Sequence, residues 1–109
     1  MAKQQLYRIA FHYHDKVYEL FCTEVCSSSI WGFVEVAGLV FEEGDGVVID
    51  PTEEKLRDRF EGVEVLHLPM HNVLRVEQVR KKGQSVIRDR KSGEKVTPFP
   101  ISPPGKSKG

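Results

Sequence analysis

Apolar and polar residues alternate on both sides of a short polar turn at His14-Asp15. A period of two residues is typical of a β-strand with one buried face. A two-residue turn pairs Tyr13 with Lys16 and Phe11 with Tyr18, which puts the apolar side chains of both arms on the same face. Residues 6–25 are therefore predicted to form a β-hairpin. Its core face consists of Tyr7, Ile9, Phe11, Tyr13, Tyr18, Leu20 and Cys22.

The aromatic side chains of this face have a second interpretation, as a platform on which nucleic-acid bases stack. The short stretch 31–34 is also similar to a fragment of the RNA-recognition motif, but the basic residue before it and the later alternating aromatic residues are missing. A chain of 109 residues needs its aromatic side chains to fill a core. We therefore favour the core interpretation.

A first helix is expected after the hairpin. The three serines at 27–29 can cap a helix, and apolar residues follow at helical spacing. Glycine and valine between 32 and 41 lower the helix propensity, so that part of 33–41 could instead be a strand. The apolar residues at helical spacing are Ile30, Phe33, Val34, Ala37 and Phe41.

A second helix is marked more clearly at residues 51–60. Asp50 has the side chain of an N-cap, Pro51 suits the first helical position, and Glu53 stands three residues after the cap. The two residues expected to be buried and the residue expected to end the helix are Leu56, Phe60 and Gly62.

The remaining segments are predicted to be short strands and turns. Alternation of apolar residues stops at a proline, resumes after three residues, and gives way to a looser hairpin near the C-terminus. The predicted strands are 47–49, 63–68 and 73–79, with a turn at 70–72 and the looser hairpin at 85–88 and 95–97.

These elements predict an α+β domain with a small antiparallel sheet of four to six strands and two short helices. The turn before the strand 73–79 resembles the turn before the last strand of SH3-like and Sm-like barrels, so that the sheet could be curled into a small open barrel. We expect a single compact domain over residues 1–100 and a flexible tail rich in Pro, Gly and Lys over 101–109. The length of 109 residues excludes a two-domain enzyme with a cleft between its lobes.

The chain has no apolar run of roughly 18–20 residues, as a membrane span would need. Its N-terminus lacks the order of regions that marks a signal peptide. We therefore expect a cytoplasmic protein without a membrane partner. Cys22 and Cys26 are too few for a disulfide framework and are expected to be free thiols.

Histidine and cysteine side chains are present, but their spacing does not fit a metal site. Neither C-x-x-C nor H-E-x-x-H occurs, and Pro69 prevents a continuous helix between His67 and His71. Cys26 precedes the first expected helix, where the helix dipole would favour a reactive thiolate, but the sequence shows no base for it. We expect no metal, no cofactor and no catalytic residue, so that an enzyme is the least favoured class of protein.

The formal net charge of zero conceals two opposed halves. Residues 1–79 carry 7 basic and 14 acidic side chains, a net charge of −7, whereas residues 80–109 carry 9 basic and 2 acidic side chains, a net charge of +7. We therefore divide the domain into an acidic part, 1–79, and a basic part, 80–100.

The basic part is the candidate contact surface, because clustered positive charge attracts phosphate groups or an acidic protein. Two alternatives stay open: the segment could only keep the protein soluble, or it could fold back on its own acidic domain. The predicted contact residues are Arg80, Lys81, Lys82, Arg88, Arg90, Lys91 and Lys95.

Several stretches taken in order resemble a bacterial family known as domain of unknown function 1820. The resemblance implies a cytoplasmic bacterial protein with a compact mixed domain that ends near residue 100, and it implies that residues 80–100 belong to that domain. It carries over no activity, substrate, cofactor or catalytic residue. The stretches are Tyr7–His12, Trp31–Val36, Val48–Leu56, Leu68–His71, Leu74–Val79 and Pro98–Pro100.

The sequence as a whole favours a non-enzymatic binding or regulatory module with a protein partner whose identity is open. The alternative is a small-barrel RNA- or DNA-binding protein that uses the basic C-terminal segment.

Overall fold

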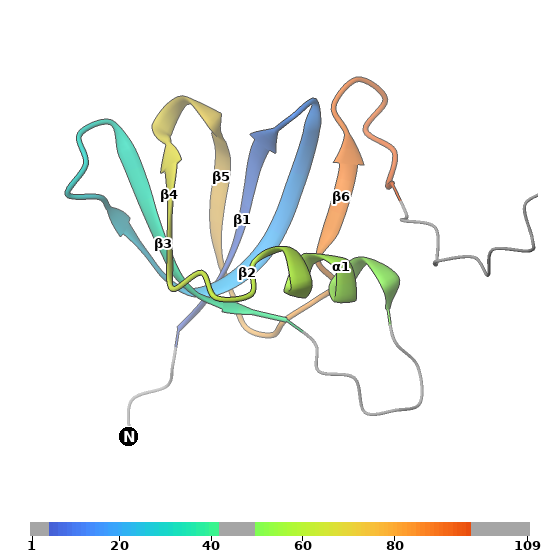
Figure 1. Cartoon of the computed structure of the whole chain (residues 1–109), viewed down its shortest axis with the longest axis horizontal. Helices are drawn as coiled ribbons and strands as arrows, with labels where there is room; N and C mark the ends of the chain where they lie inside the picture. The colour runs from blue at the N-terminus through green and yellow to red at the C-terminus, as the bar shows by residue number, and fades with distance from the viewer. Residues whose placement is uncertain (1–4, 42–49, 97–109) are drawn as a thin grey trace, which may run out of the picture.

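Six antiparallel strands form one sheet in the computed structural model, which describes residues 5–41 and 50–96 (Figure 1). Within these ranges the chain adds one α-helix, α1 (Pro51–Arg59), and one 3-10 turn, η1 (Met70–Asn72). The strands are β1 (Leu6–Tyr13), β2 (Lys16–Ser27), β3 (Phe33–Val40), β4 (Val65–Pro69), β5 (Val73–Val79) and β6 (Val86–Asp89).

The hairpin predicted at 6–25 is confirmed, with the predicted register. Tyr13 pairs with Lys16, and Phe11 pairs with Tyr18. The turn residues His14 and Asp15 have φ angles of 51° and 61°, the left-handed conformation that a two-residue type I′ turn requires at both positions. Strands joined by such a turn keep the right-handed twist of the sheet, which explains why the register is undisturbed.

Strand β2 is the longest strand among the described residues and pairs with three other strands. One of its edges pairs with β1, while the other edge pairs first with β6 and then with β3. Two further pairings, of β3 with β4 and of β1 with β5, complete the order β4-β3-β2-β1-β5, in which β4 and β5 are the two ends. The turn η1 joins these two end strands directly.

The pairing of β2 with β3 is irregular where Thr23 of β2 faces Gly38 of β3. Along β2 the side chains that join the core change from Leu20 and Cys22 to Val25, so the alternation shifts by one residue at Thr23. Gly38 has a φ of +70°, and a Cβ at this position would lie 1.9 Å from Thr23 Oγ1. Only glycine fits both requirements. Side chains on both sides of this irregularity thereby join the same core.

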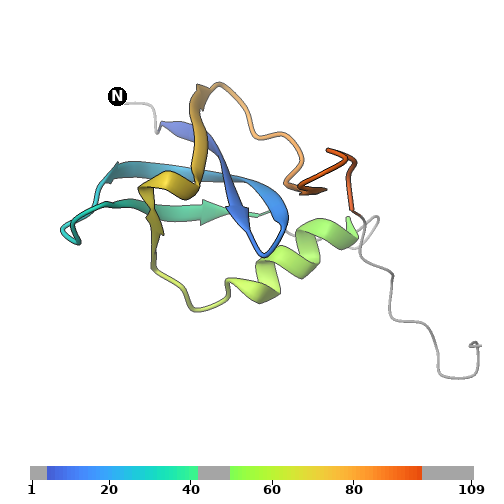
Figure 2. The ribbon, with the colours of Figure 1, turned by 90° about the horizontal axis from the view of Figure 1, so that it is seen from above.

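The helix predicted at 51–60 is confirmed as α1. Asp50 Oδ1 accepts a hydrogen bond of 2.9 Å from the backbone N–H of Thr52, as expected of an N-cap. Leu56 and Phe60 are buried as predicted, and the Phe60 ring stacks on Phe41 with 6.4 Å between ring centroids. The helix thereby covers one side of the core (Figure 2).

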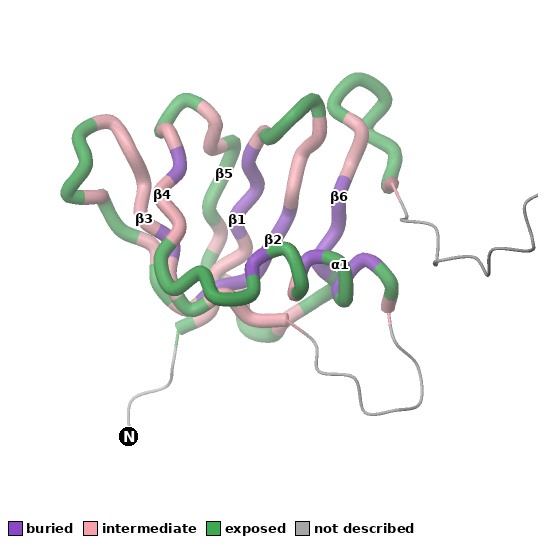
Figure 3. The backbone as a smooth tube through the Cα atoms, in the orientation of Figure 1, coloured by how far each residue is buried: buried purple, intermediate pink, exposed green. Residues whose placement is uncertain are grey.

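The core interpretation of the aromatic face is confirmed. Phe11 is buried, and Tyr7 and Tyr18 pack against the buried cluster, while Tyr13 at the end of β1 is partly exposed. Figure 3 shows that the buried stretches of the strands and of α1 converge, whereas the turns are exposed. The buried members of the cluster are Ile9, Phe11, Leu20, Cys22, Val36, Leu56, Phe60, Leu68 and Ile87.

The helix expected after Ser27–Ser29 is wrong, and the fold has one α-helix and one 3-10 turn where two helices were predicted. Residues 33–40 form β3, which was the alternative interpretation. Valines favour a strand, and pairing with both β2 and β4 satisfies the backbone of β3. Ser28 does not cap a helix, because its Oγ accepts the N–H of Ile30 within a turn.

The later strands lie where the alternation placed them. β4 and β5 flank η1 at the predicted turn, and β6 forms the first arm of the predicted C-terminal hairpin. Within the described residues, the return arm makes a bridge between Lys95 and Arg88, with backbone hydrogen bonds from Val96 N to Ile87 O and from Asp89 N to Glu94 O. The predicted strand 47–49 and tail 101–109 lie outside the described residues.

Candidate binding surface

Large apolar side chains that remain exposed are not scattered over the described residues. Apart from Tyr13, they lie beside or on β4 and β5, on the turn η1, or on the turn between β2 and β3. An ordered apolar surface of this kind is a mark of a binding site. The residues are Ile30, Trp31, Val63, Val65, Met70, Leu74 and Val76.

The most exposed of them is Trp31, with 94% of its surface accessible to solvent. It occupies a tight turn in which Phe33 N donates to Ile30 O at 3.1 Å. Gly32 at the third position of this turn has a φ of +82°, as a type II turn requires. The turn therefore points the indole away from the body of the domain.

Two contacts fix the turn to β4 and η1, and a further hydrogen bond lies within the turn. Ser28 Oγ accepts the N–H of Ile30 at 2.9 Å and lies 2.7 Å from His67 Nδ1 on β4. Met70 N donates to Gly32 O at 2.8 Å, which brings η1 against the turn. Met70 is 53% exposed and Ile30 is 47% exposed. We call Ile30, Trp31 and Met70 the apolar tip.

The predicted basic contact residues are divided by the fold. Lys82 Nζ lies 2.7 Å from Glu53 Oε2, Arg88 Nε lies 3.0 Å from Glu19 Oε2, and Arg90 Nη1 lies 3.6 Å from Asp15 Oδ1. These contacts agree with the alternative in which the basic segment folds back on the acidic part. The remaining four are exposed, in two places: Arg80 and Lys81 directly after β5, and Lys91 and Lys95 near the turn that follows β6.

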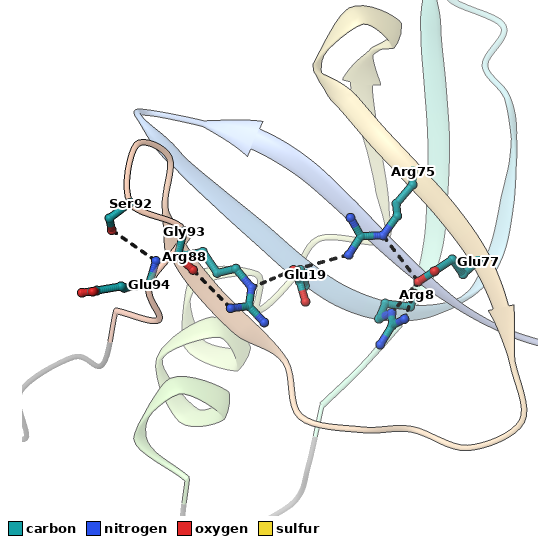
Figure 4. A network of polar contacts seen from close by, with 8 residues as sticks. All are labelled: Arg8, Glu19, Arg75, Glu77, Arg88, Ser92, Gly93 and Glu94. Atoms are coloured by element: carbon teal, nitrogen blue, oxygen red, sulfur yellow. Dashed lines mark hydrogen bonds and ion pairs between the residues drawn. The ribbon is translucent and has the colours of Figure 1, made fainter.

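Arg88 belongs to a row of charged side chains on the face of the sheet that points away from the core (Figure 4). Glu19 accepts Arg88 on one side and lies 3.6 Å from Arg75 Nη2 on the other. Arg75 also reaches Glu77, which accepts a 2.7 Å hydrogen bond from Arg8 Nε. The hydrogen bond from Arg8 holds the pKa of Glu77 below its usual value. Carboxylates thus already occupy much of the hydrogen-bonding capacity of the three arginines.

The family of the chain follows from a comparison with known proteins. The family described as domain of unknown function (DUF1820) matches residues 5–101. The chain belongs to the DUF1820 family. The match confirms the resemblance predicted from the sequence and extends over the basic residues 80–96. No curated protein and no solved structure matches the chain significantly.

Two of the stretches on which the DUF1820 resemblance rests meet at the apolar tip. One is Trp31–Val36 and the other is Leu68–His71, and the hydrogen bond from Met70 N to Gly32 O joins them. Sequence reasoning missed this surface because it placed Trp31 in a helix. The signal that could have found it is the pair Trp31-Gly32, since glycine is favoured at the third position of a type II turn and would place Trp31 on a turn and not in a helix.

This DUF1820 domain has four histidines and two cysteines. The described residues contain no group of three or more His, Cys, Asp or Glu side chains that could hold a metal ion. Cys26 lies on β2 and not at a helix N-terminus, so the predicted dipole effect on its thiol is wrong. Cys22 is buried, and desolvation raises the pKa of its thiol to about 11. Both cysteines are free thiols, as predicted.

In the described parts of the chain, no helix is long and apolar enough to cross a membrane.

Proposed function

We propose that this DUF1820 domain is a non-enzymatic binding module that contacts a partner protein through the apolar tip. The observation that carries the proposal is the 94% exposure of Trp31 on a turn that is tied to β4 and η1. A tryptophan is among the residues that contribute most to protein interfaces. A cytoplasmic bacterial location agrees with this proposal and rests on the family resemblance.

Burial of the Trp31 side chain and the order of its turn would both favour binding. Burying roughly 200 Å² of an indole in a partner would contribute about 5 kcal/mol before the costs of association. Part of those costs is the ordering of flexible groups on binding. The turn that carries Trp31 already has its backbone fixed by hydrogen bonds from Phe33 and Met70. Binding through the tip therefore loses less conformational entropy than binding through a mobile loop.

The charges near the tip favour a protein over a membrane surface. Amphipathic surfaces that insert into anionic membranes carry lysine or arginine beside their apolar groups. Neither residues 27–33 nor residues 69–74 contain a lysine or an arginine. We therefore expect the tip to enter an apolar pocket of a protein.

A capture experiment tests this proposal. The full chain and its Trp31→Ala variant are used to capture partners from cells of the source organism, with Lys91→Ala as the control, because Lys91 is exposed but distant in the fold from the tip. We expect a protein that the full chain and the control retain and that Trp31→Ala loses. Capture of the same proteins by all three would contradict the proposal.

The chain contains one tryptophan, so its fluorescence reports on the tip directly. The emission of Trp31 should shift to shorter wavelength when the captured protein is added, because the indole leaves water. Phospholipid vesicles should produce no such shift. A shift with vesicles and none with protein would favour the membrane alternative.

A second candidate function is the binding of RNA or DNA. Its support is the exposure of four cations, Arg80, Lys81, Lys91 and Lys95, together with the strand order of the sheet and the turn η1. This order is compatible with a small open barrel of the SH3 or Sm type, a scaffold that serves many functions. Binding of mixed RNA and DNA at low salt, lost in Arg80→Glu/Lys81→Glu and kept in Trp31→Ala, would favour this candidate.

A further inference from the structure

We propose that the domain associates with a second copy of itself by pairing the outer edge of β4 in one copy with the outer edge of β5 in the other. This inference rests on different residues from the apolar tip and does not depend on the proposed function.

The first observation is that both end strands have an unpaired edge. β4 pairs with β3 and β5 pairs with β1, and among the described residues no strand pairs with the other side of either. An unpaired edge presents a row of backbone N–H and C=O groups that can bind a further strand. Proteins usually protect such edges, and here Pro69 at the end of β4 is the only proline in either strand.

The second observation is the presence of two exposed aliphatic side chains beside or on each of the two strands. Val63 and Val65, before and on β4, are 38% and 40% exposed, and Leu74 and Val76 on β5 are 46% and 41% exposed. Half-exposed aliphatic side chains on edge strands contribute to stability when a neighbouring strand covers them. The two strands therefore offer apolar contacts as well as backbone hydrogen bonds.

The third observation is the charge at the ends of the two strands. This charge favours a second copy of the chain as the partner and antiparallel pairing of the two strands. The segment leading into β4 exposes Glu61 and Glu64, and the segment leaving β5 exposes Arg80 and Lys81. Antiparallel pairing places the start of one strand beside the end of the other. It therefore brings the two glutamates of one copy against the two cations of the next copy, whereas parallel pairing would not.

The contact joins the β4 edge of one copy to the β5 edge of another. A pair of copies therefore still has one free β4 edge and one free β5 edge. Such a head-to-tail contact continues from copy to copy and forms either a closed ring or an open chain. Association with further copies would thus cover both free edges through one type of contact.

The test is the mass of the full-length chain in solution as a function of concentration, by sedimentation equilibrium. We expect the wild-type mass to rise above the 12.4 kDa of one chain. Two charge-reversed variants, Glu61→Lys/Glu64→Lys and Arg80→Glu/Lys81→Glu, should each remain monomeric because like charges would then face each other. An equimolar mixture of the two should regain the wild-type mass, because each reversed edge then meets an opposite charge on the other variant.

The mixture distinguishes a lost contact from a damaged fold, since two misfolded chains would not restore assembly. Asp58→Lys and Lys91→Glu are the matched controls, because both residues are exposed and lie outside the two edges; they should keep the wild-type mass. Trp31→Ala should keep it as well. A wild-type chain that stays monomeric at the highest concentration, or variants that assemble like the wild type, would overturn the proposal, as would a mixture that stays monomeric.

Discussion

Cys22 and Cys26 are four residues apart on the same strand, but only Cys26 reaches the solvent. Burial raises the pKa of the Cys22 thiol to about 11, so that at pH 8 almost all of it is protonated and unreactive. We predict that a disulfide reagent at pH 8 modifies one thiol per folded chain and two per unfolded chain. The variant Cys26→Ser should show no rapid reaction, and a rapid reaction in that variant would show that Cys22 is accessible.

Gly38 is a position where the fold depends on a missing side chain. A left-handed φ costs a residue other than glycine about 1–2 kcal/mol, and a Cβ here would also collide with Thr23 Oγ1. We predict that Gly38→Ala lowers the free energy of unfolding, measured with urea, by more than about 2 kcal/mol. Gly93→Ala is the control, because Gly93 has a φ of +76° but an open surrounding. Equal losses in the free energy of unfolding of the two variants would show that the contact with Thr23 does not contribute.

Glu77 gives the domain a dependence of stability on pH. Its pKa in the folded chain lies below 4.5, chiefly because Arg8 donates a hydrogen bond to the carboxylate. A lowered pKa contributes stability above the pKa of the unfolded chain, and this contribution is lost as the pH falls through the folded pKa. Glu77→Gln should therefore reduce the stability at pH 7 and flatten its decline in acid. An unchanged acid profile, beside that of the exposed control Glu61→Gln, would contradict this role.

At the scale of elements, α1 and β6 are joined by one buried carboxylate. Glu53, on the first turn of α1, is 2% exposed and accepts hydrogen bonds of 2.7 Å from Ser85 N and Lys82 Nζ. Removing one member of a buried charged pair typically costs about 3–5 kcal/mol. We predict a loss of this order for Glu53→Ala, measured by urea unfolding, against a loss below about 1 kcal/mol for Glu54→Ala. Similar values for the two variants would mean that Glu53 does not hold β6 in place.

Elements with a local signal could be predicted from the sequence. The β1–β2 hairpin follows from strict alternation, and α1 follows from Asp50 and Pro51, because both signals act within a few residues. β3 was ambiguous because its apolar residues fit both a helix and a strand. Pairing with β2 and β4 decided between them, and such pairing is not visible in local spacing.

The candidate site could be predicted only in part, for the same reason. The charge division at residue 80 is visible in the sequence, but which cations meet carboxylates of the β1–β2 turn, β2 and α1 depends on distant pairings. The contact between Arg88 and Glu19, for example, joins residues 69 positions apart. The apolar tip likewise needs η1 to lie against the β2–β3 turn.

In the whole molecule, the basic part of the chain is joined to the acidic part by ion pairs. Three of the seven cations bind carboxylates of the acidic part, so the basic segment belongs to the fold between Lys82 and Arg90. The exposed apolar side chains instead gather around the tip and the two end strands. We therefore propose that the partner binds at the tip, while three of the seven predicted contact cations serve contacts within the domain.

Hydrogen–deuterium exchange of the full chain with and without its captured partner tests this placement most directly. We predict that partner binding slows exchange of the backbone amides in 28–33 and 69–72, because the partner would bury the apolar tip. Slower exchange confined to 80–96, with no change at the tip, would contradict it.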